Sequence, residues 1–509
     1  MKQADQRAME NGTSGSLLMG RASRALAAEL NFYADGDARS VVIVAGPGNN
    51  GGDGFGLAVH LQRLGWFVQL WIAADRERIK GDARDYLERA EASGVPHIWK
   101  TETSDWEHAG VDLPPGAWVV DALLGTGVQD APRSTPAAAV SFLRRIREDH
   151  RIWAIDIPTG LNPDTGNPFD AACCVRADST LSLAGPKRGC AEDHAAEWTG
   201  SVSVLDIGIE TSEDIPEELA DGEWQVLTDR EIRHALPAHT VREHKGTRGH
   251  GLFIGGSPGM SGSISMSAFA ALRSGAGLST VLAPFTTAPS IDASIQELMV
   301  LPGKQSKFMT LSPQPVPFDL FQAICIGPGL RVNQDTVELL RRVVHECPLP
   351  LVIDADGLSC LSKIGLKIGH GKRPVFLTPH PGEMGRLLNR SSREVQKDRC
   401  SAVCEAWKQT KGHVVLKGSR SRIVTMDGGR WVNCSGNEAL ATGGTGDVLA
   451  GILTGLIARG VPMNLVLPVS VALHGRAGEL ASIRNGISSV VAGDVLEALP
   501  AVFQHAEGR

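Results

Sequence analysis

An acidic residue directly follows a run of small residues at positions 441–447, which read ATGGTGD. Glycines lack a Cβ, so backbone N–H groups in such a run can converge on an anion. The apolar residues that follow predict a helix beginning at Asp447, whose N-terminus would add its dipole to the same site. We therefore expect a phosphate site that includes Gly446, with the Asp447 carboxylate placed to take a proton from a hydroxyl group. A tight turn between packed elements is the alternative interpretation.

Four further turns in the C-terminal half carry residues suited to binding or proton transfer, each directly after a short apolar run. They are Gly327-Pro328-Gly329, Asp354-Ala355-Asp356-Gly357, Thr378-Pro379-His380 and Lys417-Gly418-Ser419-Arg420-Ser421. A lysine beside glycine and serine is suited to a nucleotide phosphate. With Asp447 as the base that activates a hydroxyl, the set is typical of a kinase-like nucleotide site. His380 is equally compatible with a packed turn between its two prolines.

The N-terminal half has a glycine-rich stretch, GPGNNGGDGFG at 46–56, directly after the apolar run 40–45. Gly46, Gly48 and Gly51 satisfy the G-x-G-x-x-G pattern between a strand and a helix, which is the context of a dinucleotide site. The loop also carries polar side chains that a plain dinucleotide turn does not need, namely Asn49, Asn50 and Asp53. We therefore expect a phosphate-bearing ligand on this loop.

Two aspartates stand at the ends of further apolar runs in this half, Asp121 before Gly125-Thr126-Gly127 and Asp156 before 157–161. Acids at strand ends of open α/β sheets usually face the ligand crevice, so Asp156 is predicted to act as an acid or base. Asn50, Asp121 and Thr159 could together supply oxygens to a hard cation. Helix capping is the alternative role of the two aspartates. Lys187 either faces the same crevice or lies exposed in its loop.

Alternating strand and helix patterns position these residues. In the N-terminal half the patterns predict strands over 40–45, 67–72, 118–121, 151–156, 180–183 and 201–207, and helices over 13–30, 80–93 and 136–149. In the C-terminal half we expect a helix over 263–276 and strands over 251–254, 278–282, 323–326, 351–353, 375–377 and 414–416. Short loops between alternating elements predict parallel, doubly wound α/β sheets, whose ligands bind at the carboxyl ends of the strands.

Length and composition limit the architecture and the partners. A chain of 509 residues predicts two domains, and the acidic stretch at 212–224 reads as the linker, so we place the domains at 1–216 and 217–509. A formal charge of −7 without a basic cluster argues against nucleic acid as a partner. Nine cysteines without metal-binding spacing predict reduced thiols in the cytoplasm. Because no apolar run reaches 18 residues, we expect no membrane segment.

The motifs of nearly the whole chain resemble those of one family, the bifunctional NAD(P)H-hydrate repair enzymes, which join an NAD(P)HX epimerase to an ADP-dependent NAD(P)HX dehydratase. In the first half the resemblance rests on GPGNNGGDGFG (46–56), VVDALLGTG (119–127), AIDIPTGLN (154–162) and LAGPKRG (183–189). In the second half it rests on HKGTRGH (244–250), GSPGMSG (256–262), IGPGL (326–330), IDADGL (353–358), LTPHPGEM (377–384), LKGS (416–419) and ATGGTGD (441–447). The resemblance implies a Rossmann-like epimerase domain followed by a ribokinase-like dehydratase domain.

The resemblance also implies roles for individual residues. The hydrated nicotinamide nucleotide would contact Asn49, Asn50, Gly51, Gly52, Asp53, Gly125, Thr126, Gly127, Val128, Gln129, Asp130 and Ala131. Asp156 would act at its reactive ring, and K⁺ would be held by Asn50, Asp121 and Thr159. In the dehydratase half the substrate would contact Ser263, Gly329, His380 and Asp447. ADP, supplied with Mg²⁺, would be bound by Lys417, Gly418, Ser419, Arg420, Ser421 and Gly446.

The implied chemistry concerns a hydroxyl group on a reduced nicotinamide ring. Kinase-like geometry can turn that hydroxyl into a leaving group by phosphorylation. We expect Asp447 to take the hydroxyl proton as ADP transfers its terminal phosphoryl group, after which loss of phosphate with a ring proton restores NAD(P)H. The epimerase half would let both epimers of NADHX and NADPHX reach one stereospecific dehydratase. We also expect a homo-oligomer.

Several positions depart from the family pattern. Where the family has ENAG, this chain has GRAS at 20–23, and where the family has an aromatic residue, it has Arg248. The family's Gly-Ala is replaced by Gly262-Ser263, and its GNPGM by GNEAL at 436–440. A serine position holds Thr159, which keeps the oxygen. The GRAS change bears on epimerase activity, because that helix lies against the ligand crevice in the family.

Two alternative functions stay open at this point. The C-terminal half could be a ribokinase-type kinase of small-molecule hydroxyl groups. The N-terminal half could be a nucleotide sensor or an oxidoreductase-like domain, although the latter wants an acid near the end of its second strand. Asp75 suits that role poorly, since Ala73 and Ala74 separate it from the strand.

Overall fold

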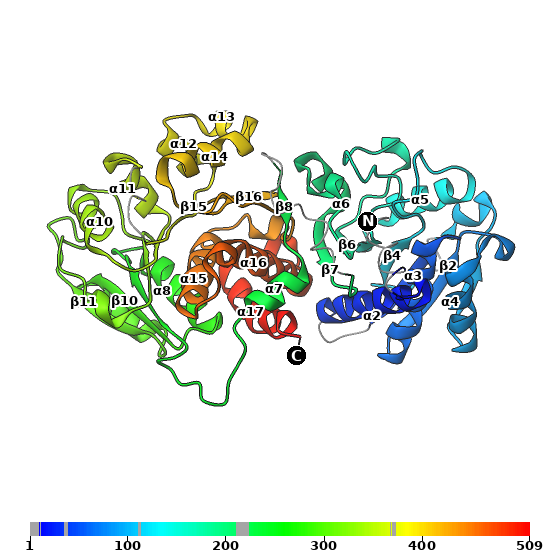
Figure 1. Cartoon of the computed structure of the whole chain (residues 1–509), viewed down its shortest axis with the longest axis horizontal. Helices are drawn as coiled ribbons and strands as arrows, with labels where there is room; N and C mark the ends of the chain where they lie inside the picture. The colour runs from blue at the N-terminus through cyan, green and yellow to red at the C-terminus, as the bar shows by residue number, and fades with distance from the viewer. Residues whose placement is uncertain are drawn as a thin grey trace. The chain divides into compact units, whose positions relative to one another are not determined.

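The computed structural model describes residues 10, 12–34, 39–109, 113–209, 223–366, 368 and 373–508, and the chain forms two compact units (Figure 1). Unit 1 comprises residues 1–222 and 228–230, and unit 2 comprises residues 223–227 and 231–509. Most of the predicted linker at 212–224 lies outside the described residues. Among those described, no helix combines the length and the apolar character needed to cross a membrane.

Unit 1 contains a parallel sheet of seven strands in the order β3-β2-β1-β4-β5-β6-β7. The strands are β1 (Ser40–Ala45), β2 (Phe67–Ile72), β3 (His97–Trp99), β4 (Trp118–Ala122), β5 (Ile152–Ile155), β6 (Ser179–Leu183) and β7 (Ser201–Leu205). The helices include α2 (Gly15–Tyr33), α3 (Asn49–Arg63), α4 (Gly81–Ala92), α5 (Ser134–Ile146) and α6 (Ala196–Thr199). Alternate residues of β1 serve opposite faces: Val42 and Val44 join a core cluster with α5, whereas Ile43 lies against Gly54 of α3. The predicted doubly wound architecture is confirmed.

Unit 2 contains a sheet of ten strands in the order β11-β10-β9-β12-β13-β14-β15-β16-β17-β8. The strands are β8 (Gln225–Val226), β9 (His250–Ile254), β10 (Leu278–Pro284), β11 (Met299–Gly303), β12 (Ala323–Ile326), β13 (Leu351–Ile353), β14 (Val375–Leu377), β15 (His413–Leu416), β16 (Ser421–Val424) and β17 (Arg430–Asn433). The pairs β15–β16 and β16–β17 are antiparallel, and the remaining neighbours are parallel. The antiparallel extension was not predicted.

Helices pack on this sheet and complete unit 2 (Figure 1). They include α8 (Ser261–Arg273), α9 (Ala288–Ser294), α10 (Gln334–Glu346), α11 (Asp356–Ile364), α12 (Pro381–Leu388), α13 (Ser392–Lys397), α14 (Arg399–Thr410), α15 (Thr445–Ala458), α16 (Met463–Asn485) and α17 (Ala492–Ala506). The core under the sheet is built from apolar strand residues such as Ile326, Ile353 and Leu377, all fully buried.

Helix α15 carries Asp447, and its glycines set its distance from α8. A Cβ on Gly451 would overlap the Ser267 carbonyl oxygen, and one on Gly455 would lie 2.8 Å from the Ala271 Cα. Helices α8 and α15 are therefore in close contact. The predicted start at Asp447 is two residues late, because Gly444 adopts a left-handed conformation (φ +91°) as the N-cap and the helix begins at Thr445.

Replacing Gly451 with Ala should destabilise unit 2 by about 1–3 kcal/mol, because overpacking outweighs the better helix propensity of alanine. Gly493→Ala in α17 is the matched control, since a Cβ at that position meets nothing within 4 Å. Denaturant unfolding of both variants measures the difference. Equal stability of the two variants would contradict the close contact of α8 and α15.

Candidate active sites

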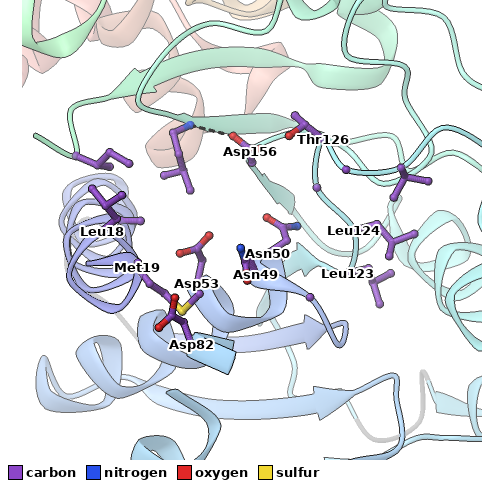
Figure 2. Close-up of a pocket in the computed structure, with 18 of the residues that line it drawn as sticks. Leu18, Met19, Asn49, Asn50, Asp53, Asp82, Leu123, Leu124, Thr126 and Asp156 are labelled. Carbon is purple, nitrogen blue, oxygen red and sulfur yellow. Dashed lines mark hydrogen bonds between the residues drawn. The ribbon is translucent and has the colours of Figure 1, made fainter. Parts of the chain in front are cut away.

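A cavity of about 490 Å³ opens at the carboxyl edge of the unit 1 sheet (Figure 2). Its lining includes many predicted binding residues, namely Asn49, Asn50, Asp53, Gly125, Thr126, Gly127, Val128 and Asp156. Five predicted residues are not part of the lining: Gly51, Gly52, Gln129, Asp130 and Ala131. The cavity therefore brings together the glycine-rich loop, the loop after β4 and the acid after β5, as expected from a parallel sheet.

The start of α3 forms the floor of this cavity. Asn49, Asn50 and Asp53 belong to the first turns of the helix, not to a loop, because α3 begins at Asn49. Gly51 lets the helix start this close to the sheet, since a Cβ there would overlap the Gly46 carbonyl oxygen. The N–H groups at the start of a helix attract anions, so the α3 N-terminus has the geometry of an anion-binding site.

Asp121 and Thr159 form a buried hydrogen-bonded pair beside the cavity. The two Asp121 carboxylate oxygens accept from the Thr159 hydroxyl and the Thr159 N–H, each at 2.8 Å. Burial raises the pKa of Asp121 to about 6, although the Thr159 and Leu123 hydrogen bonds oppose the shift. The Thr159 hydroxyl also accepts from the Leu124 N–H at 3.1 Å.

Asn50 packs against Gly125 of the loop after β4, because a Cβ on Gly125 would be 3.5 Å from the Asn50 Cβ. Its side chain is buried, and within the described part of the chain its Nδ2 has no hydrogen-bond partner. The pair of Asp121 and Thr159 thus adjoins Leu124, and Asn50 adjoins the next residue, Gly125. Oxygen atoms of an amide, a carboxylate and a hydroxyl are the ligands that hard cations prefer.

Asp156 and Lys187 form an ion pair at the wall of the cavity (Figure 2). The Lys187 side chain is 4% exposed, so the exposed-loop interpretation of this lysine is wrong. Its ammonium group also donates to the Leu183 carbonyl oxygen at 3.0 Å. Asp156 has a positive φ of +67°, and no described helix begins directly after it or after Asp121. The capping interpretation of these two acids is therefore wrong.

One wall of the cavity comes from α2, the helix that the family resemblance places against the ligand crevice, but its individual lining residues were not predicted. Leu18, Met19 and Ala22 of α2 line it, and so do Asp82, Leu183 and Ile207. The apolar stripe of α2 was visible in the sequence, but a stripe alone does not distinguish core packing from a ligand wall. Of the residues at 20–23 (GRAS), Ala22 lines the cavity. The Ser23 hydroxyl instead donates to the Met19 carbonyl oxygen at 2.8 Å, and its side chain packs against α3.

The candidate site of unit 2 lies where neighbouring parallel strands end. Gly327, Asp354, Thr378 and Lys417 directly follow β12, β13, β14 and β15. The Asp354 Oδ1 atom accepts from the Thr378 hydroxyl at 2.6 Å and from the Lys417 ammonium group at 3.0 Å. A Cβ on Gly327 would overlap the Asp354 carbonyl oxygen, so the loops after β12 and β13 are in direct contact.

Asp447 stands beside this cluster, in the first turn of α15. Its carbonyl oxygen accepts from the Ser267 hydroxyl at 2.6 Å, and its carboxylate is hydrogen-bonded to Ser263 one turn earlier on α8. Burial raises the pKa of Asp447 to about 6, against the opposing effects of Ser263 and Lys417. A carboxylate with this pKa is a competent base near neutral pH.

Gly329 supports the loop that precedes α8. Its φ is +60°, and a Cβ there would lie 2.5 Å from the Met260 carbonyl oxygen. The Ser257 N–H donates to the Gly329 carbonyl oxygen at 2.7 Å. Gly329 therefore lies against the loop that leads to Ser263.

His380 caps helix α12. Its Nδ1 accepts from the Gly382 N–H at 3.0 Å, and the Glu383 carboxylate accepts from the His380 N–H at 2.9 Å. Burial, with nearby Lys417 and Arg386, lowers the pKa of His380. Since Nδ1 is an acceptor, the neutral ring carries its proton on Nε2. The structure thus gives His380 a capping bond, while the Nε2 atom of its half-exposed ring lies 3.5 Å from the Glu383 Oε1 atom.

The predicted nucleotide stretch after β15 forms the turn between β15 and β16. Gly418 and Ser421 close the turn, because the Ser421 hydroxyl donates to the Gly418 carbonyl oxygen at 2.9 Å. Arg420 is buried and donates to the Cys434 carbonyl oxygen at 3.0 Å, whereas Ser419 is exposed. Lys417 is the member of this stretch that reaches Gly446: a Cβ there would lie 3.2 Å from the Lys417 Nζ.

Two family models match the chain. The N-terminal model, described as YjeF-related protein N-terminus, matches residues 15–189, and the model described as NAD(P)H-hydrate dehydratase matches residues 252–501. The bifunctional NAD(P)H-hydrate repair enzyme Nnr of Moorella thermoacetica is 34% identical, over 94% of this chain and 90% of its own length. The enzyme of the same name from Coxiella burnetii is 32% identical, over 98% of this chain and 97% of its own length.

A solved structure resembles unit 2. It is the ADP/ATP-dependent NAD(P)H-hydrate dehydratase from Bacillus subtilis, co-crystallised with ATP and Mg²⁺. The two sequences are 30% identical, and the match covers 56% of this chain and 100% of that chain with a TM-score of 0.50.

Replacing His380 with Ala should lower the stability of unit 2 by about 1 kcal/mol, because the N–H groups at the start of α12 lose their acceptor. Asn is a good N-cap residue, so His380→Asn should keep most of that stability. Thermal unfolding of the two variants gives the comparison. If the Ala and Asn variants were equally stable, the capping role would be contradicted.

Proposed function

The chain belongs to the bifunctional NAD(P)H-hydrate repair enzymes, and we propose which side chains carry its two reactions. The enzyme epimerises R- and S-NAD(P)HX and dehydrates S-NAD(P)HX to NAD(P)H. We assign epimerisation to a domain at 1–216 and dehydration to a domain at 217–509. Because relatives of this name match nearly the whole chain, the alternatives of a ribokinase-type hydroxyl kinase and of a sensor domain are not retained.

In the epimerase domain, Asp156 handles the proton as the ring hydroxyl leaves and returns. The observation that supports this role is the ion pair with Lys187 at the cavity wall. The pair keeps the carboxylate in place, and Lys187 offers a proton donor next to it. The substrate lies on 49–53 and 125–131, with its phosphates at the N-terminus of α3.

Three side chains of this domain would hold K⁺, namely Asn50, Asp121 and Thr159. The unsatisfied amide of Asn50 and the oxygen-rich pair of Asp121 and Thr159 support this assignment. A bound cation would supply positive charge beside the substrate phosphates. Asp121 would also be kept ionised by the cation, which offsets the effect of its burial.

In the dehydratase domain, Asp447 is the base. Its carboxylate takes the proton of the ring hydroxyl while the terminal phosphoryl group of ADP moves to the hydroxyl oxygen, which leaves AMP and a phosphate ester. The C–O bond then breaks, phosphate leaves, and loss of a ring proton gives NAD(P)H. The backbone N–H groups of 442–446 stabilise the charge on the transferring oxygens. This role rests on the position of Asp447 in the first turn of α15.

The nucleotide phosphates meet Lys417 and Gly446, with Gly418, Ser419, Arg420 and Ser421 completing the turn beside them. Within the described residues, no group of three His, Cys, Asp or Glu side chains is arranged to hold a metal. We therefore place Mg²⁺ chiefly on the phosphates, as is usual for this ion. ADP is the proposed phosphoryl donor in preference to ATP.

Ser263, Gly329 and His380 contact the hydrated ring or its ribose in this proposal. Ser263 reaches the Asp447 carboxylate, and the His380 ring is half-exposed, so a ligand can compete with Glu383 for its Nε2 proton. Nine cysteines without metal-binding spacing suit a reducing compartment, so we place the enzyme in the cytoplasm. The homo-oligomer stays a prediction.

Replacing Asp447 with Asn should lower kcat for dehydration by about 10²–10⁴-fold, the usual contribution of a general base.

The Asp447 carboxylate must be ionised to act as the base, and burial raises its pKa to about 6. Dehydration by the unmodified enzyme should therefore be lost as the pH falls through about 6. Steady-state NADPH formation by the unmodified enzyme between pH 5 and 8 measures this loss of dehydration at low pH. The control for Asp447→Asn is Asp319→Asn, at an exposed position. Undiminished turnover of Asp447→Asn would exclude this residue as the base.

A further inference from the structure

Three adjacent strands of unit 2 deliver three interacting side chains to one point. Asp354, Thr378 and Lys417 each directly follow a strand, and these strands, β13, β14 and β15, are neighbours in the sheet. A single oxygen, Asp354 Oδ1, accepts from the Thr378 hydroxyl at 2.6 Å and from the Lys417 ammonium group at 3.0 Å. The Asp354 side chain is 2% exposed and the Lys417 side chain 20% exposed, so the pair is shielded from water.

Lys417 occupies an unfavourable place for a cation. Its Nζ is so near the N-terminus of α15 that a Cβ on Gly446 would lie 3.2 Å from it. The N-terminal end of a helix is positive and repels an ammonium group. A lysine stem also has four rotatable carbons and does not hold a position without a partner. The lysine therefore needs an anchor to stay beside the anion loop.

Asp354 provides that anchor. Burial opposes the charge on Lys417, but Asp354 and then Glu383 outweigh it and raise the pKa of Lys417. Burial raises the pKa of Glu383 to about 7, so Glu383 is only partly ionised near neutral pH. Asp354 is therefore the carboxylate in direct contact that keeps the ammonium group in place. Thr378 fixes the same oxygen from the neighbouring strand.

We propose that Asp354 is a positioning residue for phosphoryl transfer, which together with Thr378 holds the Lys417 ammonium group at the anion loop of α15. This inference rests on the proposed role of Lys417 as a ligand of the nucleotide phosphates. Asp354 is itself an anion near those phosphates, so it does not add to nucleotide affinity. Its contribution is the placement of Lys417 where charge develops during transfer.

Asp354→Asn should therefore lower kcat at least tenfold, while the Kd of ADP stays within threefold of the original or becomes smaller because a repulsive charge is removed. Thr378→Val should lower kcat less, by roughly threefold or more, and Thr378→Ser, which keeps the hydroxyl, should restore it. Calorimetric titration with ADP and Mg²⁺ gives Kd, and NADPH formation from S-NADPHX gives kcat. If Asp354→Asn does not fold, the comparison of kcat between Thr378→Ser and Thr378→Val still tests the proposal.

Lys417→Met separates this inference from the role on which it rests. If Lys417→Met keeps the original kcat and ADP affinity, the proposed role of Lys417 fails. If Lys417→Met loses turnover but Asp354→Asn and Thr378→Val turn over normally, only the positioning role fails. A loss of ADP affinity in Asp354→Asn that accounts for its whole loss of activity would also overturn the inference. Equal losses in Thr378→Val and Thr378→Ser would indicate a packing role and contradict it.

Discussion

Both sites depend on how closely neighbouring loops approach at the carboxyl edge of a parallel sheet. Backbone meets backbone there with no room for a side chain, as at Gly46 against Leu123 in unit 1 and at Gly327 against Asp354 in unit 2. This proximity lets residues from distant parts of the sequence share one cavity or cluster. It also brings the N-termini of α3 and α15 to the edge, where their N–H groups can bind phosphate.

Each unit then pairs a shielded lysine with a carboxylate at this edge, Lys187 with Asp156 and Lys417 with Asp354. Burying a charge has a large desolvation free energy unless the charge is paired and hydrogen-bonded. Each ion pair offsets this free energy for its lysine and its carboxylate. The two pairs differ in use. In unit 1 the carboxylate is proposed to act on the substrate, whereas in unit 2 a separate acid, Asp447, is the proposed base.

Much of this arrangement could be predicted from the sequence, because apolar runs that end in Gly, Asp or Lys locate strand ends and their loops. The strands at 40–45, 323–326 and 351–353 have the predicted bounds. Other features depend on packing that spacing does not reveal. The start of α3 at Asn49 requires the close contact of Gly51 with the Gly46 carbonyl oxygen. The α2 wall of the cavity is a tertiary contact, and β16 and β17 follow a turn whose residues resemble a binding loop. The His380 cap, in contrast, is local, because His380 bonds residues two and three positions further along the chain.

We expect one chain to carry a working epimerase beside a working dehydratase, and the recovery of NADPH absorbance from a mixture of both NADPHX epimers tests both activities together. ADP and Mg²⁺ would be supplied, and the unmodified enzyme would be compared with Asp156→Asn. We expect rapid, complete recovery by the unmodified enzyme, and a rapid phase limited to the S epimer for Asp156→Asn. Equally rapid and complete recovery by both proteins would contradict the role of Asp156, and no recovery by the unmodified enzyme would contradict the presence of the two activities in this chain.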